Sequence, residues 1–239
     1  DGEARYGEIA VESLDGSVRL VYTVYQHAAV NSQSDDIRKA LIDLYNSTDG
    51  DRWTWNDNWC SDLPLSEWYG ITTYKEAGIS DDDGVARIAL SNNNLTGTLP
   101  SSIGLLSGGR IGVSLSSNHI SGTLPKEAFR LAALDLGNNE IDAIEAPDDP
   151  SEIMTTHISL YNNRISGPLP EYLGHAPVLQ QLRLENNRFT GPVPSSYSRL
   201  IASNAVLHLN GNELSGRIPD DILDKPGFAT VWPQIFWQN

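Results

Sequence analysis

The sequence has a single cysteine, Cys60, and little positive charge. One cysteine cannot form an intramolecular disulfide, and it cannot build a metal site that needs several thiolates. Lysine and arginine number 16 against 31 aspartate and glutamate residues, which gives a formal net charge of −15. Such a surface repels phosphate backbones, so binding to nucleic acid or to an anionic membrane is disfavoured. No apolar run is long enough to span a membrane.

Motifs for catalysis are also missing. The five histidines are scattered. The sequence has no nucleophile elbow, no phosphate-binding loop and no two histidines at a spacing that would let both bind one metal ion. We therefore expect a protein that is not an enzyme and that needs no cofactor. Of the acidic residues, 17 lie before residue 87, so the negative charge is concentrated in the N-terminal third.

One segment is repeated six times. It first occurs as Ile88-Ala-Leu-Ser-Asn-Asn-Asn-Leu-Thr-Gly-Thr-Leu-Pro100, and five copies follow. In each copy the apolar-x-apolar pair predicts a short strand, and stacked copies predict a parallel sheet. The amide of the central asparagine can bond backbone groups of the adjacent coil, while the glycine permits a tight bend. The six asparagines are Asn93, Asn118, Asn139, Asn163, Asn187 and Asn212.

The consensus L-x-L-x-x-N-x-L-[ST]-G-x-[IL]-P resembles the plant-type leucine-rich repeat, which is also common in protist and bacterial surface proteins. The resemblance implies an α/β repeat fold, a right-handed leucine-rich-repeat solenoid with short parallel strands on its concave face, over residues 87–219. The third copy departs from the consensus after Ile141, where Asp-Ala-Ile-Glu-Ala-Pro-Asp-Asp-Pro replaces the expected Gly-x-Leu-Pro. We expect the third coil to take a different path, and this irregularity is a candidate partner site.

Residues 34–86 resemble the N-terminal cap of such proteins. Ser34 is expected to cap a helix with an apolar face of Ile37, Leu41, Leu44 and Tyr45. A tryptophan-rich stretch follows, and Ile71–Tyr74 and Val85–Leu90 are predicted to form a strand pair. Ser66 and Thr73 stand where plant caps have cysteines. The plant cap disulfide is therefore absent, and Cys60 is expected to pack in the cap as a small hydrophobic residue.

The two ends lie outside the repeat. In residues 1–33, apolar residues alternate around Asp15-Gly16, which predicts a β-hairpin extension. Residues 220–239 are predicted to form a C-terminal cap or tail, because an exposed end coil needs a cover.

The strand positions between the inward-facing residues point out from the concave face. In the early coils they are small, whereas in the later coils they carry charged, aromatic and imidazole groups. If a partner binds to the concave face, its contacts are expected at His157, Tyr161, Arg183, Glu185 and His208. The alternative is that these are ordinary solvated residues of a sheet.

Two weaker features concern ions and glycans. Asp81, Asp82 and Asp83 are weak candidates for calcium binding, but they lack the spacing of a calcium loop, so no metal site is predicted. Asn46 and Asn94 begin Asn-x-Thr sequons and are candidates for glycosylation. The sequons favour a secreted or cell-surface protein, or one in an organelle lumen.

The sequence thus predicts a non-catalytic recognition or scaffold module that binds a protein partner, alone or as a subunit of a larger assembly. One alternative is a protein that binds carbohydrate or a cell-wall polymer, which exposed aromatic residues near Tyr161 and the cap tryptophans would favour. Another is a mainly structural subunit held by its terminal extensions. The sequence does not identify the partner or the oligomeric state.

Overall fold

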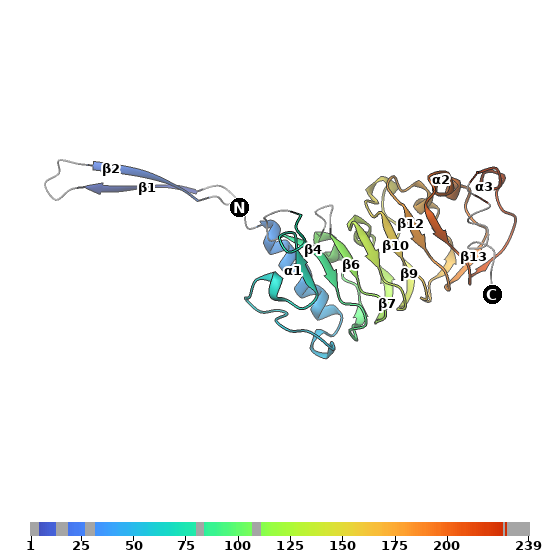
Figure 1. Cartoon of the computed structure of the whole chain (residues 1–239), viewed down its shortest axis with the longest axis horizontal. Helices are drawn as coiled ribbons and strands as arrows, with labels where there is room; N and C mark the ends of the chain where they lie inside the picture. Colours follow the sequence, from blue (N-terminus) through green and yellow to red (C-terminus); the bar gives the residue numbers. More distant parts are fainter. Residues whose placement is uncertain are drawn as a thin grey trace.

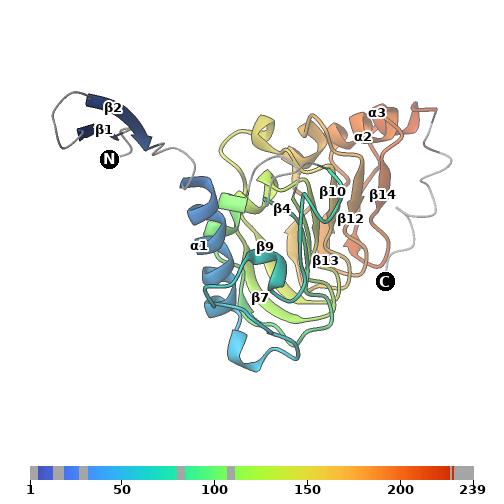
Figure 2. The same ribbon diagram turned by 60° about the vertical axis from the view of Figure 1, so that its left-hand side comes forward.

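The computed structural model describes residues 5–12, 19–26, 32–79, 84–106, 111–226 and 228, with side chains for all of them except residues 5–12, 19–26 and 32–34. From residue 84 onward the chain winds into successive coils. Figure 1 shows the strands of these coils side by side along one face, and Figure 2 shows short helices on the opposite side.

The main sheet has seven strands in the order β14-β12-β10-β8-β6-β4-β3. Six of them come from the six repeats and are parallel, as the repeat predicts. The first strand, β3, pairs with β4 in the antiparallel direction, as predicted for the cap. The strands are β3 (Ile71–Thr73), β4 (Val85–Ala89), β6 (Gly112–Ser114), β8 (Ala133–Asp135), β10 (His157–Ser159), β12 (Gln181–Arg183) and β14 (Val206–His208).

A second line of parallel strands runs along the turn side of the coils, and it is broken at the third repeat. β5 (Thr96–Thr98), β7 (His119–Leu124) and β9 (Glu140–Ile144) form one sheet, and β11 (Ser166–Pro168), β13 (Arg188–Gly191) and β15 (Glu213–Leu214) form another. The register shifts between β7 and β9, and within residues 111–226 no strand pairing joins β9 to β11. The irregular third coil therefore does take a different path, as predicted.

Short helices cover the other side of the coils. α1 (Ser32–Ser47) packs on η3 (Ser101–Leu106), which packs on η4 (Lys126–Arg130), and η5 (Pro150–Glu152) packs on η6 (Glu171–His175). The layer continues with η7 (Ser195–Tyr197), α2 (Ser198–Ala202) and α3 (Asp220–Leu223), while η1 (Gly50–Arg52) and η2 (Leu65–Glu67) lie in the cap. None of the described helices is long and apolar enough to cross a bilayer.

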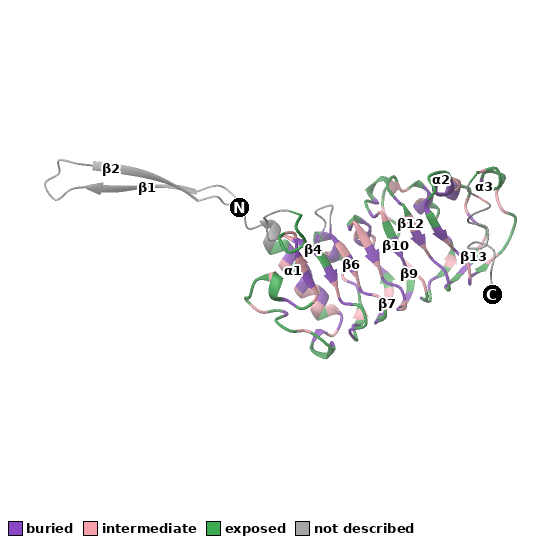
Figure 3. Cartoon of the chain, in the orientation of Figure 1, coloured by how far each residue is buried: buried purple, intermediate pink, exposed green. Residues whose placement is uncertain are grey.

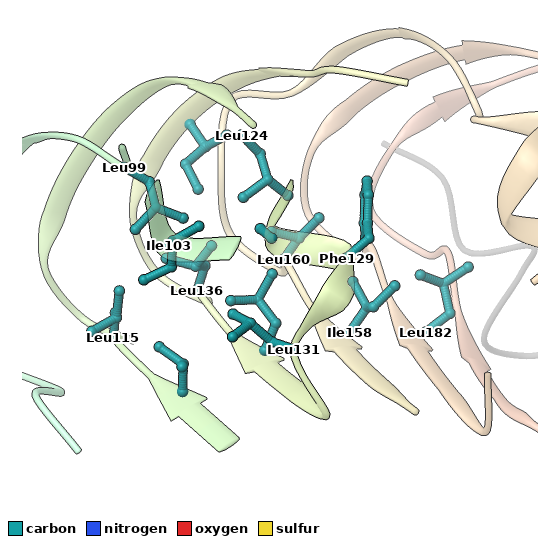
Figure 4. Close-up of a cluster of buried hydrophobic side chains, with 14 of the residues drawn as sticks. Leu99, Ile103, Leu115, Leu124, Phe129, Leu131, Leu136, Ile158, Leu160 and Leu182 are labelled. Carbon is teal, nitrogen blue, oxygen red and sulfur yellow. The ribbon is translucent and has the colours of Figure 1, made fainter. Parts of the chain in front are cut away.

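The hydrophobic core fills the space between the strands and the helices. Figure 3 shows the buried residues following the strands from coil to coil, and Figure 4 shows leucine and isoleucine side chains of successive coils meeting inside, with Phe129 among them. Leu115, Leu136, Leu160 and Leu184 have no exposed surface. No single coil could bury these side chains alone, so the coils depend on one another for stability.

The buried asparagines form the predicted ladder. Asn163 is typical, because its Nδ2 donates to the carbonyl oxygens of Leu160 and Leu136 at 3.0 Å. Its Oδ1 accepts from the backbone N–H of Ile141 at 3.0 Å. The same arrangement repeats at Asn118, Asn139, Asn187 and Asn212. The glycines after them have positive φ, as the bend requires.

Two expectations for the cap were wrong. Ser34 does not cap the helix, because α1 begins two residues earlier, at Ser32. Cys60 is exposed and has φ of 60°, since it lies in a turn whose neighbouring tryptophans fill the interior. Trp53, Trp59 and Trp68 are buried and contact one another edge-on or tilted. The predicted apolar face of the helix is correct, with Ile37, Leu41 and Leu44 buried and Tyr45 packed against the core.

The N-terminal strands β1 (Arg5–Glu12) and β2 (Arg19–Gln26) pair in the antiparallel direction, with Tyr6 opposite Tyr25. The Asp15-Gly16 turn expected between them lies outside the described residues, as does the predicted C-terminal cap or tail beyond residue 226, apart from Phe228. The domain boundaries therefore stay predictions.

Candidate partner-binding site on the concave face

Four of the five candidate residues come together on the later coils. The Arg183 guanidinium carbon lies 4.3 Å from the centre of the Tyr161 ring, which is a cation–π distance. The guanidinium Nε donates to Glu185 Oε1 at 2.8 Å, and a second guanidinium nitrogen contacts the same oxygen. His208 Nδ1 lies 3.9 Å from Glu185 Oε1. These four residues, called the concave cluster below, belong to three successive coils.

Tyr161 is held over a glycine of the neighbouring coil. A Cβ atom added at Gly137 would lie 2.1 Å from the Tyr161 ring, so only glycine leaves room for the ring in this position. The Tyr161 hydroxyl also accepts a hydrogen bond from Asn138 Nδ2 at 3.3 Å. The ring is thus positioned before any ligand arrives, which reduces the entropy lost on binding.

Glu185 is unusual because a carboxylate on this face is buried. Only 7% of its side chain is exposed, since Arg183 and His208 lie against it. Oε1 contacts both Arg183 and His208, whereas no donor among the described residues reaches the buried Oε2. A buried oxygen without a donor is costly, and a donor on a ligand reaches Oε2 only when the side chains that cover it move aside.

His157 lies apart from the concave cluster. It is exposed at the start of β10, and its Nδ1 is 2.8 Å from Thr156 Oγ1. It lines two clefts, together with Gln181. One cleft, of about 620 Å³, runs across the strand starts of the earlier coils and is bordered by Arg183. The other, of about 910 Å³, lies between η6 and α2. His157 therefore connects the two clefts.

The larger cleft has a lining that the sequence interpretation missed. Arg199 and two histidines, His157 and His175, line it, and no aspartate or glutamate is among the described residues that line it, although the chain has a net charge of −15. Because His175 and Arg199 are one repeat step of 24 residues apart, they occupy matching positions in adjacent coils. Comparing the repeats column by column outside the strands would have revealed this pair.

The remaining candidates concern calcium and glycans. Asp81, Asp82 and Asp83 lie outside the described residues, and in the described part of the chain no three histidine, cysteine or acidic side chains gather as metal ligands would. The sequon asparagines Asn46 and Asn94 are exposed, and Asn94 Nδ2 donates to the Arg52 carbonyl at 2.9 Å.

Comparisons with known proteins agree with this fold. Residues 86–106, 154–176 and 178–200 match the family described as Leucine Rich Repeat. No curated protein matches the sequence. Among solved structures, the pollen receptor kinase 3 is 28% identical, with a TM-score of 0.59, and the alignment covers 78% of this chain and 88% of that one.

Two similar structures contain peptide hormones. The ectodomain of the Arabidopsis receptor kinase HAESA, in complex with an N-terminally extended IDA peptide, is 32% identical over 60% of this chain, with a TM-score of 0.52. The plant receptor RGFR1, in complex with RGF2, is 35% identical over 56% of this chain, with a TM-score of 0.50. The alignments cover 24% and 22% of those two chains. The strand order, the asparagine ladder and these similarities together show that the chain is a leucine-rich-repeat solenoid with the fold of plant receptor ectodomains.

Proposed function

We propose that the chain is a non-catalytic recognition module that binds a protein partner through the later coils of its concave face. The observation that carries the proposal is Glu185, a buried carboxylate whose Oε2 has no donor among the described residues. Tyr161 and Arg183 stand beside it, already stacked on each other. Aromatic and arginine side chains are the residue types that contribute most binding energy in protein interfaces.

The shape and charge of the site favour an extended segment of the partner. The concave cluster and the two clefts form one continuous surface, because Arg183 borders the smaller cleft and His157 and Gln181 border both. A lysine amine or a backbone N–H of the partner would supply the donor for Glu185 once the side chains that cover Oε2 move aside. An acidic side chain of the same segment would complement Arg199 in the larger cleft. The peptide hormones bound to HAESA and RGFR1 are precedents for such segments on this fold.

We further propose that this recognition takes place outside the cell or in an organelle lumen. The two sequon asparagines are on the surface, and the similar structures include receptor ectodomains. A subunit role in a larger assembly is compatible with the same binding surface.

The first test exchanges the two charges of the concave cluster. The double variant R183E/E185R keeps an ion pair and the net charge but reverses the polarity that a partner meets. We expect proteins captured from the native source by the unaltered chain to bind this variant at least tenfold more weakly, about 1.4 kcal/mol in binding free energy. Captured proteins are identified by mass spectrometry, and their affinities are then measured by surface plasmon resonance.

The matched control is the exchange R130E/E152R. Arg130 and Glu152 form an ion pair of 3.3 Å on the helix side of the coils, so their exchange perturbs the same chemistry away from the concave face. The control should bind as the unaltered chain does. Equal binding by the unaltered chain and R183E/E185R would contradict the proposed site.

A second test moves Tyr161 without removing it. In Gly137→Ala the new methyl group occupies the place of the ring, so Tyr161 must leave its position beside Arg183, and we expect about tenfold weaker partner binding. Gly167→Ala is the control, because Gly167 lies in β11, away from the concave strands, and nothing lies within 4 Å of its added Cβ. If both alanine variants bind the partner equally well, the position of Tyr161 is irrelevant to recognition.

A further inference from the structure

A second surface, separate from the concave cluster, lies where the concave strands end. Its first part is a stacked pair of aromatic residues in the cap. Trp55 and Tyr69 have ring centres 5.8 Å apart and planes inclined by 25°. They are 43% and 37% exposed, whereas the other described cap tryptophans are buried. Large aromatic side chains that stay exposed together indicate a binding surface.

The aromatic pair is rigidly attached to the first coil. The Trp55 backbone N–H donates to Asn93 Oδ1 at 2.7 Å, and Asn93 Nδ2 donates back to the Trp55 carbonyl at 2.9 Å. The Tyr69 carbonyl accepts from Trp59 Nε1 at 2.9 Å. Ligand binding would therefore cost little ordering of the two rings.

From this pair, a row of uncharged polar side chains runs along the coils. It occupies the position just before each of the first five buried asparagines, since Gly211 precedes the sixth. It is called the turn row: Asn92, Ser117, Asn138, Asn162 and Asn186. All five residues have φ between 52° and 59°. Asparagine tolerates this conformation better than most residues, and it aligns the side chains from coil to coil.

The asparagines of the later coils in the turn row are linked but retain hydrogen-bonding capacity. Asn186 Nδ2 donates to Asn162 Oδ1 at 2.7 Å, and Asn162 Nδ2 donates to Asn138 Oδ1 at 2.6 Å. Since an amide has two N–H groups and two acceptor lone pairs, these bonds leave one N–H and one lone pair of Asn162 for a ligand. The turn row thus offers donors and acceptors without charge.

We propose that Trp55, Tyr69 and the turn row bind an extended, neutral, β-1,4-linked polysaccharide. A pyranose presents C–H groups on its ring face, which suit the negative face of an aromatic ring. Its hydroxyl groups donate and accept, as the amides do. Successive coils repeat at about 4.8 Å, which is close to the length that one sugar adds to an extended β-1,4-linked chain, so each coil can meet one sugar.

The alternative occupants fit this surface less well. A nucleic acid is repelled by the acidic chain, and a charged polysaccharide finds no charged side chain in the turn row. A protein would be expected to use apolar anchors along its interface, and the turn row supplies none beyond the aromatic pair. The neutral polysaccharide is therefore the ligand that matches the whole surface.

The test measures binding of three soluble β-1,4-linked probes, cellohexaose, mannohexaose and xylohexaose, to the full chain by isothermal titration calorimetry and tryptophan fluorescence. We expect at least one hexasaccharide to bind, and to bind more tightly than its disaccharide, because a longer probe meets more coils. Laminarihexaose, which is β-1,3-linked, and polygalacturonate, which is charged, should bind at least tenfold more weakly.

Two variants connect binding to the surface. Trp55→Ala should lower the affinity at least tenfold, and Asn162→Gly, which suits a positive φ, should lower it at least threefold. Met154→Ala removes another exposed apolar side chain and should have no effect. If Trp55→Ala lowers the thermal unfolding midpoint, the affinities of Tyr69→Ala and Asn162→Gly for the probes test the proposal instead. The proposal is overturned if no β-1,4-linked probe binds at millimolar concentration, if the comparison polymers bind equally well, or if these variants bind like the unaltered chain.

Discussion

Asn163→Ala should lower the free energy of unfolding by about 3–5 kcal/mol, since each buried polar group left without a partner costs roughly 1–3 kcal/mol. The substitution removes the amide that serves the carbonyl oxygens of Leu136 and Leu160 and the backbone N–H of Ile141. Asn163 is in the fourth of six repeats, so fraying at an end of the solenoid cannot relieve the loss. A water molecule that enters the vacated space would bond some of these groups, so the expected cost is less than the upper limit for three groups left without partners.

The measurement is urea unfolding followed by circular dichroism and by tryptophan fluorescence. Circular dichroism reports mainly on the coils. The four described tryptophans are in the cap, and the other two, Trp232 and Trp237, are replaced by phenylalanine in every protein measured, so that fluorescence reports on the cap. In a repeat protein, one weak coil can unfold before its neighbours. We therefore expect the circular dichroism transition of Asn163→Ala to move to lower urea by more than the fluorescence transition.

Asn162→Gly is the matched control for this prediction. Asn162 is the preceding residue, also an asparagine, but it is exposed and has φ of 52°. Glycine accepts this conformation, and only surface hydrogen bonds are lost, so the cost should be about 1 kcal/mol or less. If Asn163→Ala costs no more than Asn162→Gly, the buried ladder does not stabilise the coils in the way described.

The sequence predicted the repeating parts of the fold because their physics recurs in every coil. The apolar-x-apolar pairs gave the strands, the asparagines gave the buried ladder, and the glycines gave the bends. It also located the break after Ile141, since a lost consensus is visible in an alignment of the repeats. The start of α1 was misplaced by three residues, because an N-cap at Ser34 puts the first helical residue at Asp35, whereas α1 begins at Ser32. Asparagine and serine are both favoured as N-caps, so Asn31, Ser32 and Ser34 are equally good candidates in the sequence.

What sequence reasoning could not supply depends on contacts between particular side chains. The five concave residues looked equivalent, yet Tyr161, Arg183, Glu185 and His208 form a cluster, whereas His157 lies at the opposite end of its strand. The place of Tyr161 depends on Gly137 having no side chain, in a coil 24 residues earlier. The burial of the Glu185 side chain depends on how the Arg183 and His208 side chains pack against it. The sequence does not distinguish Trp55 from Trp59. Only the packing shows that Trp55 is exposed and Trp59 is buried.

Gly97→Ala should separate the N-terminal cap from the first coil. Gly97 has φ of 130°, and a Cβ atom added there would lie 2.2 Å from the carbonyl oxygen of Ser47, at the end of α1. The Ser47 carbonyl cannot turn away easily, because hydrogen bonds hold the backbone of the next residue, Thr48. The Thr48 carbonyl accepts from Thr96 N–H at 3.0 Å and from Trp53 Nε1 at 2.9 Å. The methyl group can therefore fit only if the end of α1 moves away from β5.

Gly167→Ala, the equivalent substitution in a later coil, is the control, because it introduces backbone strain without a steric clash. Gly167 occupies the same repeat position with φ of 91°, and nothing lies within 4 Å of its added Cβ. Gly167→Ala should therefore show only the strain of an unfavourable φ, of order 1–3 kcal/mol. Gly97→Ala should cost roughly 1–3 kcal/mol more, as overpacking does. Its fluorescence transition should occur at lower urea than its circular dichroism transition, because the tryptophans of the cap are released first. Equal costs and coincident transitions for the two variants would show that contact between α1 and β5 does not hold the cap on the solenoid.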